Sequence, residues 1–351
     1  MLSRSTLLAL LCAPLAAVAA PRYTITALPV GTSPTAINSA GQIVGDMQVG
    51  GERRGFVWSN GTLVQIGTLG GPASSAMAIN ASGVIAGYAS LPGGGPGAFS
   101  YAGGALTPLQ VFDATASYGY AINDSGHVAG GYYTEAGGWR AFIQQAGNSV
   151  DLGTLGGDYT WANGINNAGH AVGMSALDNT SPWLSHAFYY ADGVMTDLGT
   201  MLDASLSEAT AINDLDQIAG HGWVYGSHHA FLYQNGVMQD LGTLGGRRSF
   251  AYDINNLGQV VGNSNDPDDF DYFAYVYDHG MMTDLNTLID PASGWTLHDA
   301  HGINDSGQIA AYGCRGDECA ALLLELAAVP EPAAWLMVLT GLGLLGLRRK
   351  V

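Results

Sequence analysis

A short acidic segment gathers the side chains best suited to holding a metal ion. The stretch NSNDPDDFDYF, Asn263–Phe273, contains Asp266, Asp268, Asp269 and Asp271. Carboxylate oxygens are ligands that Ca²⁺ prefers, but the spacing matches neither an EF-hand loop nor a calcium-binding nonapeptide repeat. Two interpretations stay open, a Ca²⁺ site and a solvated acidic loop, and the spacing favours the loop. Ca²⁺ is the one cofactor that the sequence suggests.

A second group of residues combines aromatic rings with charged side chains. These residues follow recurring LGG triplets, where otherwise similar segments of the chain differ most. Aromatic rings present an apolar face, and Arg and Asp side chains hydrogen-bond polar groups. The mixture suits a saccharide, and we predict ligand binding at Asp158, Tyr159, Trp161, Arg247, Arg248 and Phe250.

Recognisable catalytic motifs are missing from the sequence. GTLGG, Gly67–Gly71, has the glycines of a phosphate loop but lacks the Lys-Ser/Thr pair that binds phosphate and Mg²⁺, so we interpret it as a turn. Neither His-Glu-x-x-His nor Gly-x-Ser-x-Gly occurs. His186 and His229 share one position of a repeated segment, which favours a strand-edge or packing role over metal binding. We predict no catalytic residue, and an enzyme is the less favoured reading.

The composition indicates an acidic, turn-rich chain. Gly occurs 51 times in 351 residues, about twice its usual share, and 29 acidic residues face 11 basic ones. Glycine in this amount is typical of tight turns. An acidic surface repels phosphate backbones, so we expect no nucleic-acid partner.

One motif recurs along the whole body of the chain. It reads AINSAGQIVG in its first copy and GINDSGQIAA in its last. The seven copies place Asn at 38, 80, 123, 166, 213, 255 and 304, with spacings of 42, 43, 43, 47, 42 and 49 residues. Repeats of this length are typical of propellers, solenoids and arrays.

Each repeat contains four short apolar stretches separated by turn residues. In the copy from Ser249 these are SFAYDIN, QVVGNS, YFAYVY and MMTDLNTL. Asn-Gly and Asp-Gly pairs separate the third stretch from the fourth in several copies, and these pairs favour tight hairpins. Each repeat is therefore predicted to be a four-stranded antiparallel meander.

The strand order predicts how the repeats assemble. Seven sheets set radially bury both faces of each sheet, which an isolated meander cannot do. The last copy lacks a fourth strand and the first residues hold a spare one, Tyr23–Leu28. We therefore predict an all-β fold over residues 21–327, a seven-bladed β-propeller closed by the N-terminal strand. A β-solenoid is the alternative, and the Asn-Gly hairpins count against it.

The two ends of the chain have the features of targeting signals. Residues 1–19 have one Arg, an apolar run and small residues before the expected cleavage after Ala19, as in a secretory signal peptide. A buried N-terminal helix is the alternative. Residues 328–351 hold VPEPAA, an uncharged apolar stretch at 333–347 and a basic tail. As a helix this stretch rises roughly 22 Å, short of a hydrocarbon core of about 30 Å.

The C-terminal segment resembles the PEP-CTERM sorting signal of Gram-negative bacteria. Pro330, Glu331 and Pro332 match its tripeptide, and Arg348 and Arg349 match its basic end. The resemblance implies transient insertion in the inner membrane through the apolar helix, removal of the tail by an exosortase, and release to the cell surface or exterior. It implies handling rather than activity.

The repeats resemble the HAF-repeat family of secreted bacterial proteins. The resemblance covers residues 22–326 and is carried by His186-Ala187-Phe188, His229-Ala230-Phe231 and the DLGTLGG segments that begin at Asp151 and Asp240. Other copies keep the Ala-Phe part and lose the His. The family implies no established activity.

Two cysteines remain after the signal peptide. Cys314 and Cys319 flank a predicted hairpin, and an exported location is oxidising. A disulfide is therefore favoured over free thiols. Arg315-Gly316-Asp317 between them spells an adhesion tripeptide, which we attribute to chance.

The sequence favours an exported, non-enzymatic surface or matrix protein that is structural or binds extracellular polysaccharide. Two alternatives stay open, a secreted glycan hydrolase or lyase with acids at the channel mouth, and a Ca²⁺-dependent adhesin. The enzyme needs two facing carboxylates that break the repeat pattern. Asp158 and Asp266 break it, but sequence spacing does not pair them.

Overall fold

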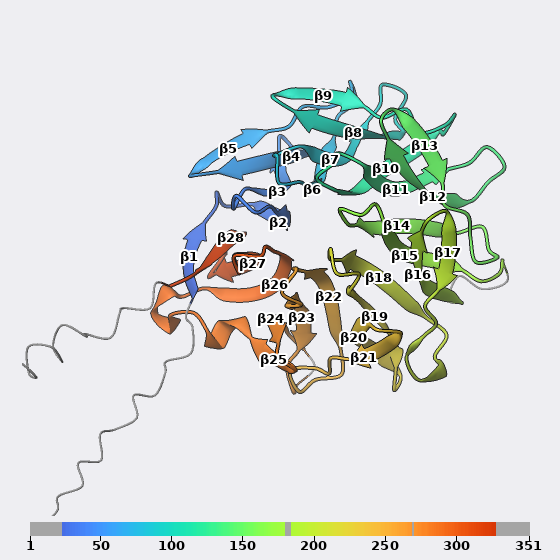
Figure 1. Cartoon of the computed structure of the whole chain (residues 1–351). Helices are drawn as coiled ribbons and strands as arrows, with labels where there is room; N and C mark the ends of the chain where they lie inside the picture. The colour runs from blue at the N-terminus through green and yellow to red at the C-terminus, as the bar shows by residue number, and fades with distance from the viewer. Residues whose placement is uncertain (1–22, 180–183, 269, 328–351) are drawn as a thin grey trace, which may run out of the picture.

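The chain forms seven four-stranded antiparallel sheets around one axis (Figure 1). This computed structural model describes residues 23–179, 184–268 and 270–327. The predicted signal peptide, the sorting residues Pro330, Glu331, Pro332, Arg348 and Arg349, and the apolar stretch 333–347 lie outside the described residues. Within the described ranges no helix is long and apolar enough to cross a membrane. The predicted seven-bladed propeller is confirmed.

The blades follow one another in chain order. Blade 1 comprises β2 (Thr32–Ile37), β3 (Ile43–Val49), β4 (Glu52–Ser59) and β5 (Thr62–Gln65). Blade 2 comprises β6 (Ser74–Ile79), β7 (Ile85–Ser90), β8 (Pro96–Ala102) and β9 (Ala105–Pro108). Blade 3 comprises β10 (Ala116–Ile122), β11 (Val128–Tyr133), β12 (Trp139–Gln145) and β13 (Asn148–Asp151). Blade 4 comprises β14 (Thr160–Ile165), β15 (Ala171–Ala176), β16 (Ser185–Ala191) and β17 (Val194–Asp197).

The remaining blades carry the short helices and the closure. Blade 5 comprises β18 (Ser207–Ile212), β19 (Ile218–Val224), β20 (Ser227–Gln234) and β21 (Val237–Asp240), preceded by the 3-10 helix η1 (Met201–Asp203). Blade 6 comprises β22 (Ser249–Ile254), β23 (Val260–Asn265), β24 (Tyr272–Asp278) and β25 (Met281–Asp284), followed by η2 (Leu285–Thr287) and η3 (Pro291–Ser293). Blade 7 comprises β26 (Thr296–Ile303), β27 (Ile309–Arg315), β28 (Glu318–Leu326) and the N-terminal β1 (Tyr23–Ala27).

Turn residues divide the ring into two sides. Gly258 has φ +78° in the turn between β22 and β23, and Asn235-Gly236 has φ +53° and +79° between β20 and β21. These left-handed conformations are those expected of Asn and Gly in tight turns. Both kinds of turn lie on one side, here called the turn face. The loops between second and third strands and the connections between blades form the opposite side, the loop face.

One expected strand is shorter than its sequence suggested. The apolar stretch MMTDLNTL ends as a strand at Asp284 and continues as η2. The Asp284 side chain accepts a hydrogen bond from the backbone N–H of Asn286, and the Asn286 side chain donates to the backbone carbonyl of Leu297 at 2.9 Å. These polar contacts turn the chain back toward blade 7.

Layers of apolar side chains between neighbouring blades form the core. Large rings at one repeated position are fully buried, at Phe56, Phe99, Phe142, Phe188, Phe231 and Tyr275. Close approach of the backbones makes Gly necessary at another position, because a Cβ on Gly130 would lie 1.9 Å from the carbonyl oxygen of Tyr118. Five other second strands carry Gly there; in blade 7 the position is Ala311, and there β26 carries a second register shift.

The N-terminal strand closes the ring. β1 pairs antiparallel with β28, from Tyr23 opposite Leu326 to Ala27 opposite Leu322. The contact extends beyond the strands, since the N–H of Leu28 donates to the carbonyl of Ala321 at 2.9 Å. Tyr23 and Leu28 are buried, so the closure joins the core. This is the predicted arrangement, in which the first strand of the body completes the last blade.

Candidate functional site

A closed belt of asparagines surrounds the axis at the turn face. The Asn of each Ile-Asn pair donates from Nδ2 to the backbone carbonyl of the corresponding Asn in the next blade. The seven bonds measure 2.9–3.1 Å, and the last, from Asn304 to Asn38, closes the circle. All seven side chains are at least 94% buried. The Nδ2 groups of all seven Asn side chains are engaged in these bonds between blades, so we assign the belt a structural role.

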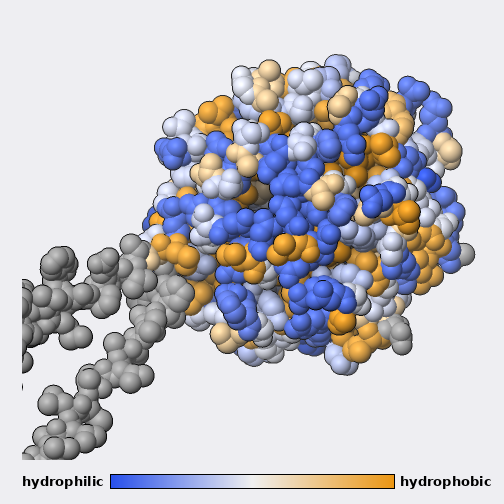
Figure 2. All heavy atoms as spheres, viewed as in Figure 1, coloured by the Kyte–Doolittle hydropathy of each residue, from blue (hydrophilic) through white to orange (hydrophobic). Residues whose placement is uncertain are grey.

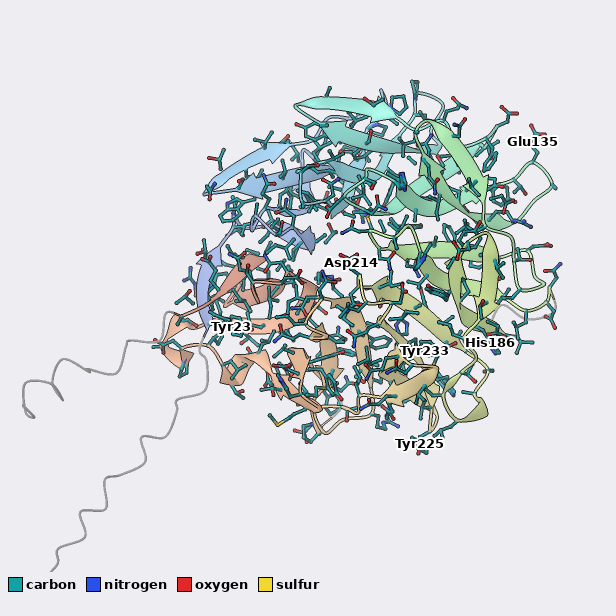
Figure 3. The ribbon with its side chains drawn as sticks, in the orientation of Figure 1. Tyr23, Glu135, His186, Asp214, Tyr225 and Tyr233 are labelled. Atoms are coloured by element: carbon teal, nitrogen blue, oxygen red, sulfur yellow. A yellow bond between two sulfur atoms is a disulfide. The ribbon has the colours of Figure 1, made fainter. Side chains whose placement is uncertain are left out.

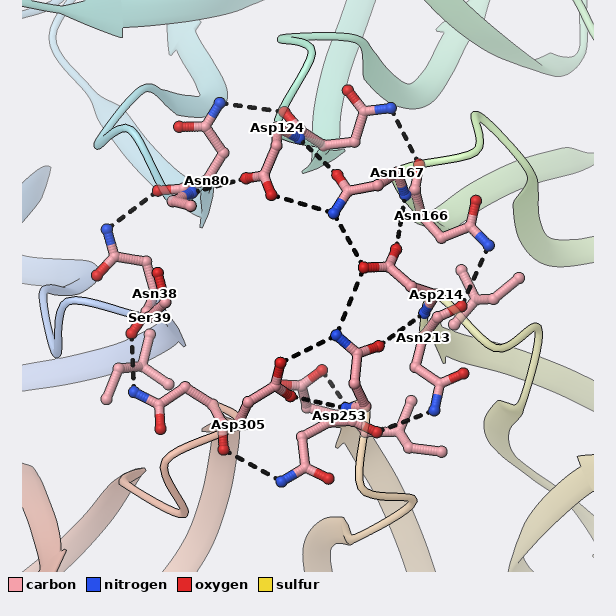
Figure 4. A pocket seen from close by; sticks show the side chains of 18 of the residues that line it. Asn38, Ser39, Asn80, Asp124, Asn166, Asn167, Asn213, Asp214, Asp253 and Asp305 are labelled. Atoms are coloured by element: carbon pink, nitrogen blue, oxygen red, sulfur yellow. Dashed lines mark hydrogen bonds between the residues drawn. The ribbon is translucent and has the colours of Figure 1, made fainter.

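The residues that follow the belt form an inner ring at the channel mouth (Figure 4). Carboxylates and amides alternate there over five blades, at Asp124, Asn167, Asp214, Asn256 and Asp305. The Nδ2 of Asn167 donates to both neighbouring carboxylates at 3.0 Å. This mouth has a volume of about 230 Å³. Hydrophilic side chains gather over the middle of the molecule in Figure 2, and Asp214 lies near the middle in Figure 3.

The channel wall is built from the position three residues before each belt Asn. Unlike the belt, this position varies among the repeats and holds five residue types: Thr35, Met77, Tyr120, Asn163, Thr210, Tyr252 and His301. In six blades a register shift in the innermost strand brackets the position, and in blade 7 it falls within the second of two such shifts. These side chains line a cavity of about 200 Å³. The repeat therefore builds a constant frame around a variable channel.

Asp253 is the one carboxylate in the wall of this channel cavity. Its side chain accepts backbone N–H bonds from Ile254 and Ile303, each at 2.8 Å. Other repeats have Ala or Gly at this position. Burial raises the pKa of Asp253 to about 7, and the two N–H bonds oppose part of that rise. The carboxyl group therefore titrates near neutral pH.

An aromatic platform lies on the loop face of blades 3 and 4. We define it as Tyr118, Tyr133, Trp139, Tyr159 and Trp161. The Trp139 and Trp161 rings stack with centroids 4.4 Å apart, and Tyr133 and Tyr159 contact their edges at 5.3 and 5.5 Å. Tyr133 is 38% exposed and Tyr159 42% exposed. The platform offers flat apolar surface beside phenolic and indole donors.

A separate pocket lies on the loop face between blades 5 and 6. This blade-5 pocket, of about 560 Å³, is lined by Ser205, Leu206, Trp223, His228 and Arg248. The Trp223 ring meets His228 edge-on with centroids 5.1 Å apart. Its volume lies in the range typical of small-ligand sites.

Behind the pocket residue His228 lies a layer formed by Phe250, His221 and Glu208. His228 stacks on Phe250 with centroids 5.2 Å apart, and His221 contacts the same ring at 5.0 Å. His221 Nε2 lies 3.7 Å from a Glu208 oxygen. Burial lowers the pKa of His221 to about 4 and also lowers that of His228, so both imidazoles are neutral at pH 7.

The predicted ligand-binding residues fall into two groups separated by blade 5. Tyr159 and Trp161 belong to the platform, and Arg248 lines the pocket that Phe250 supports. Arg247 precedes the pocket residue. Asp158 instead joins two loops, because its carboxylate accepts from Asn179 Nδ2 at 2.8 Å and its N–H donates to Asn179 Oδ1. Sequence reasoning missed Trp139, Trp223 and His228, although each lies at a strand end beside a variable loop.

The repeated histidines pair with acids across the outer strands. His186 Nδ1 lies 2.9 Å from the Asp197 carboxylate, and His229 pairs in the same way with Asp240. Blade 3 has Arg140 in this position, 3.1 Å from Asp151. His186 lies toward the outer rim in Figure 3. The observed pairing is that of a strand-to-strand link.

The predicted metal site and the predicted disulfide differ in what the structure shows of them. Within the described residues no three His, Cys, Asp or Glu side chains gather in a way that could hold a metal ion, Asp266, Asp268 and Asp271 included. Asp269 lies outside the described residues. Cys314 and Cys319 face each other in the β27–β28 hairpin and form a disulfide.

Comparison with known proteins identifies the fold. No family model matches the chain, and no curated protein matches it. The β-propeller domain of the Trilobed protease from Pyrococcus furiosus is similar, with TM-score 0.58 and 10% identity over 88% of this chain and 98% of that one. That domain is described as having an open velcro topology, whereas β1 closes the ring here.

Two further structures share the architecture. Pyrococcus horikoshii acylaminoacyl peptidase has TM-score 0.51 and 12% identity, covering 72% of this chain and 44% of that one. YCF48, solved bound to D1 peptide, has TM-score 0.51 and 11% identity over 89% and 97%. At these identities the likeness concerns architecture alone, and this chain is a seven-bladed β-propeller.

Proposed function

We propose that this protein is an exported, non-enzymatic propeller that binds carbohydrate at its loop face. The observation that carries the proposal is the platform, where two stacked indoles and three tyrosines adjoin one another on the loop face of blades 3 and 4. Flat rings cover the apolar face of a pyranose, while hydroxyl and indole N–H groups reach its hydroxyls. Export rests on the resemblance of the two chain ends to secretion and sorting signals.

The platform can be disturbed without removing any of its rings. A Cβ on Gly131 would lie 2.2 Å from a ring carbon of Trp161, so Gly131→Ala displaces that indole. We expect this variant to lose at least tenfold in affinity for the glycan that the native protein binds best on a glycan array. Tyr225→Ala is the matched control, because Tyr225 is 84% exposed and lies away from the axis (Figure 3).

Three results on the array would count against the proposal. Equal glycan affinity of the Gly131→Ala variant and the Tyr225→Ala variant would place binding elsewhere. Absence of any bound glycan would remove the ligand class. Release of new reducing ends from a bound glycan would show a hydrolase. Unchanged melting temperature of the Gly131→Ala variant is needed to attribute a loss to the platform.

Processing of the chain ends has its own test. We propose cleavage after Ala19 and removal of the tail by an exosortase, with transient insertion in the inner membrane. Intact-mass analysis of protein recovered from a Gram-negative host with an exosortase should show neither end. Replacing Pro330 and Pro332 by Ala should leave the tail attached and the protein in the membrane fraction. A tail retained equally by native and variant chains would contradict this.

A further inference from the structure

An arc of exposed apolar side chains lies on one half of the turn face. Two positions of the repeat supply it, the second residue after each belt Asn and the first residue of each outermost strand. In blades 1–3 these positions hold small or polar residues: Ala40, Thr62, Ser82, Ala105, Ser125 and Asn148. In blades 4–6 all but one are large and apolar, and we call them the apolar arc: Val194, Leu215, Val237, Leu257 and Met281. Each of these side chains is 62–67% exposed.

Packing within the ring does not explain the apolar arc. Blades 1–3 form the same turns with Ser, Thr, Ala or Asn at the equivalent positions, so the fold does not require Leu or Met there. A single exposed apolar side chain is ordinary, whereas a set gathered on one side of a molecule is typical of an interaction surface. The arc is therefore a candidate docking surface.

The apolar arc adjoins the place where the described chain leaves blade 7. Leu326 is the last residue of β28 and is 47% exposed. It pairs with Tyr23 at the turn-face end of blade 7, where β1 and β28 lie side by side (Figure 1). Leu257, Met281 and Leu326 line one groove of about 450 Å³ between blades 6 and 7. The apolar surface therefore extends from blade 6 to the end of β28.

A short stretch of sequence links this groove to the apolar segment 333–347. Only residues 327–332 separate Leu326 from Ala333, and a chain of that length spans at most about 25 Å when extended. Insertion of 333–347 in a membrane belongs to the proposed function, and the present inference rests on it. An inserted segment holds the turn face within about 25 Å of the lipid. So short a tether raises the local concentration enough for weak apolar contacts to form.

The charges of the two faces decide which kind of lipid surface fits. The described arginines all lie at loop-face ends of strands or in loop-face connections: Arg53, Arg54, Arg140, Arg247, Arg248 and Arg315. The turn face instead carries carboxylates, among them Asp192, Asp214, Asp278 and Asp305. Anionic headgroups attract basic segments and repel an acidic face. The surface that suits the apolar arc is therefore zwitterionic.

We propose that the apolar arc and Leu326 lie on the surface of a zwitterionic membrane while the segment 333–347 is inserted. The channel mouth then faces the lipid. The loop face, which carries the aromatic platform, faces away from the membrane and toward any extracellular glycan. Docking thus orients the binding side of the propeller outward.

Lipid quenching of a fluorophore on the tailed, full-length protein tests this orientation. The protein is placed in phosphatidylcholine nanodiscs that contain a spin-labelled lipid, with Cys12 replaced by Ser and an NBD label on Ser306→Cys or Ser125→Cys. Both serines are exposed and occupy the same position of the repeat, but Ser306 lines the groove and Ser125 lies in blade 3. We expect quenching at position 306 to be at least threefold stronger than at position 125.

Matched variants connect the quenching to the apolar arc. Leu257→Ser with Met281→Thr introduces residue types that other blades carry at these positions, and it should make quenching at positions 306 and 125 equal. Val64→Ser, an exposed Val of blade 1 outside the arc, should leave the difference intact. Replacing a third of the lipid by phosphatidylglycerol should weaken quenching at position 306, because the turn face is acidic.

Several outcomes would overturn the orientation. These are equal quenching at positions 306 and 125 in the native background, unchanged quenching in the double variant, or stronger quenching with anionic lipid. Shielding of position 306 that rises with protein concentration and ignores the lipid would show a second copy of the chain on this face instead.

Failure of the proposed function is distinguishable from failure of this inference. Protein that does not co-purify with the nanodiscs would refute tail insertion, and the orientation with it. Protein that inserts but shows equal quenching would refute the orientation alone. Thermal melts show whether each variant is folded, and Leu257→Ser alone replaces the double variant if that variant is unstable.

Discussion

At the residue scale, the belt Asn of each blade both accepts hydrogen bonds within its own turn and donates one to the next blade. The Asn80 side-chain Oδ1 accepts from the N–H groups of Ser82 and Val84, which shapes its own turn, and its Nδ2 donates to the backbone carbonyl of Asn123 in the next blade. No other side chain of similar size both accepts and donates in this way. Asp lacks the donor and Ser lacks the reach, which explains why Asn recurs at this position.

Replacing one belt Asn should therefore destabilise the protein markedly. Asn80→Ala removes the hydrogen bonds that this buried side chain makes with the N–H groups of Ser82 and Val84 and with the Asn123 carbonyl, and we expect the free energy of unfolding to fall by about 2–3 kcal/mol. Urea denaturation measures it. Ser82→Ala, which removes only a hydroxyl at the same Asn, should cost less than about 1 kcal/mol. Equal losses in the two variants would contradict a role for the belt.

Asp253 should make stability depend on pH. Its folded pKa of about 7 lies above the ordinary value of 3.8, so protonation favours the folded state. The resulting stability is present below about pH 4 and is lost as pH rises through 7. Asp253→Asn removes this titration.

Comparison of two pH values isolates the effect. Between pH 5 and pH 8 the stability of the variant relative to the native protein should rise by about 2 kcal/mol, less than the full shift implies because only the span from pH 5 to the folded pKa of about 7 contributes. Urea denaturation of both proteins at the two pH values gives the difference. A difference independent of pH would show that Asp253 ionises normally.

At the element scale, the β27–β28 hairpin carries a covalent link beside the closing strand. Cys314 and Cys319 are register partners, and β28 pairs on its other side with β1. A disulfide over so short a loop stabilises by about 2 kcal/mol in the chain-entropy account. Replacing both cysteines by Ser should lower the free energy of unfolding by about that amount.

Reducing agent provides the control for this prediction. It should destabilise the native protein to the level of the double variant and leave the double variant unchanged. Identical stability of all four samples would mean that the link is not formed in solution.

Elements were more predictable than the site. The repeated Asn-Gly pairs and the alternating apolar residues indicate local strands and turns, and local rules decide those. The stacking of Trp139 on Trp161 joins two blades, and no local pattern pairs them. The channel position of Tyr120 or His301 depends on register shifts in the innermost strands. Such shifts follow from packing between blades, which a single repeat does not encode.

At the scale of the whole molecule, the repeats build a regular ring, and the side chains in its channel and on its loop face vary from blade to blade. The belt recurs in all seven repeats and the buried aromatic ring in six, while channel and loop-face residues vary. Closure was foreseeable because the strand count left one spare strand at the start and one vacancy at the end. The belt could not be foreseen from the sequence, because a recurring Asn is equally typical of a turn.

Closure by β1 holds this frame together and keeps both sites on one rigid face. Native-state hydrogen exchange of the backbone amides in residues 23–28 tests it most directly. The account predicts that these amides exchange only on global unfolding, as slowly as those of β27 in the interior of the same blade. Exchange as fast as in exposed loops, with β27 still protected, would show an open ring and contradict it.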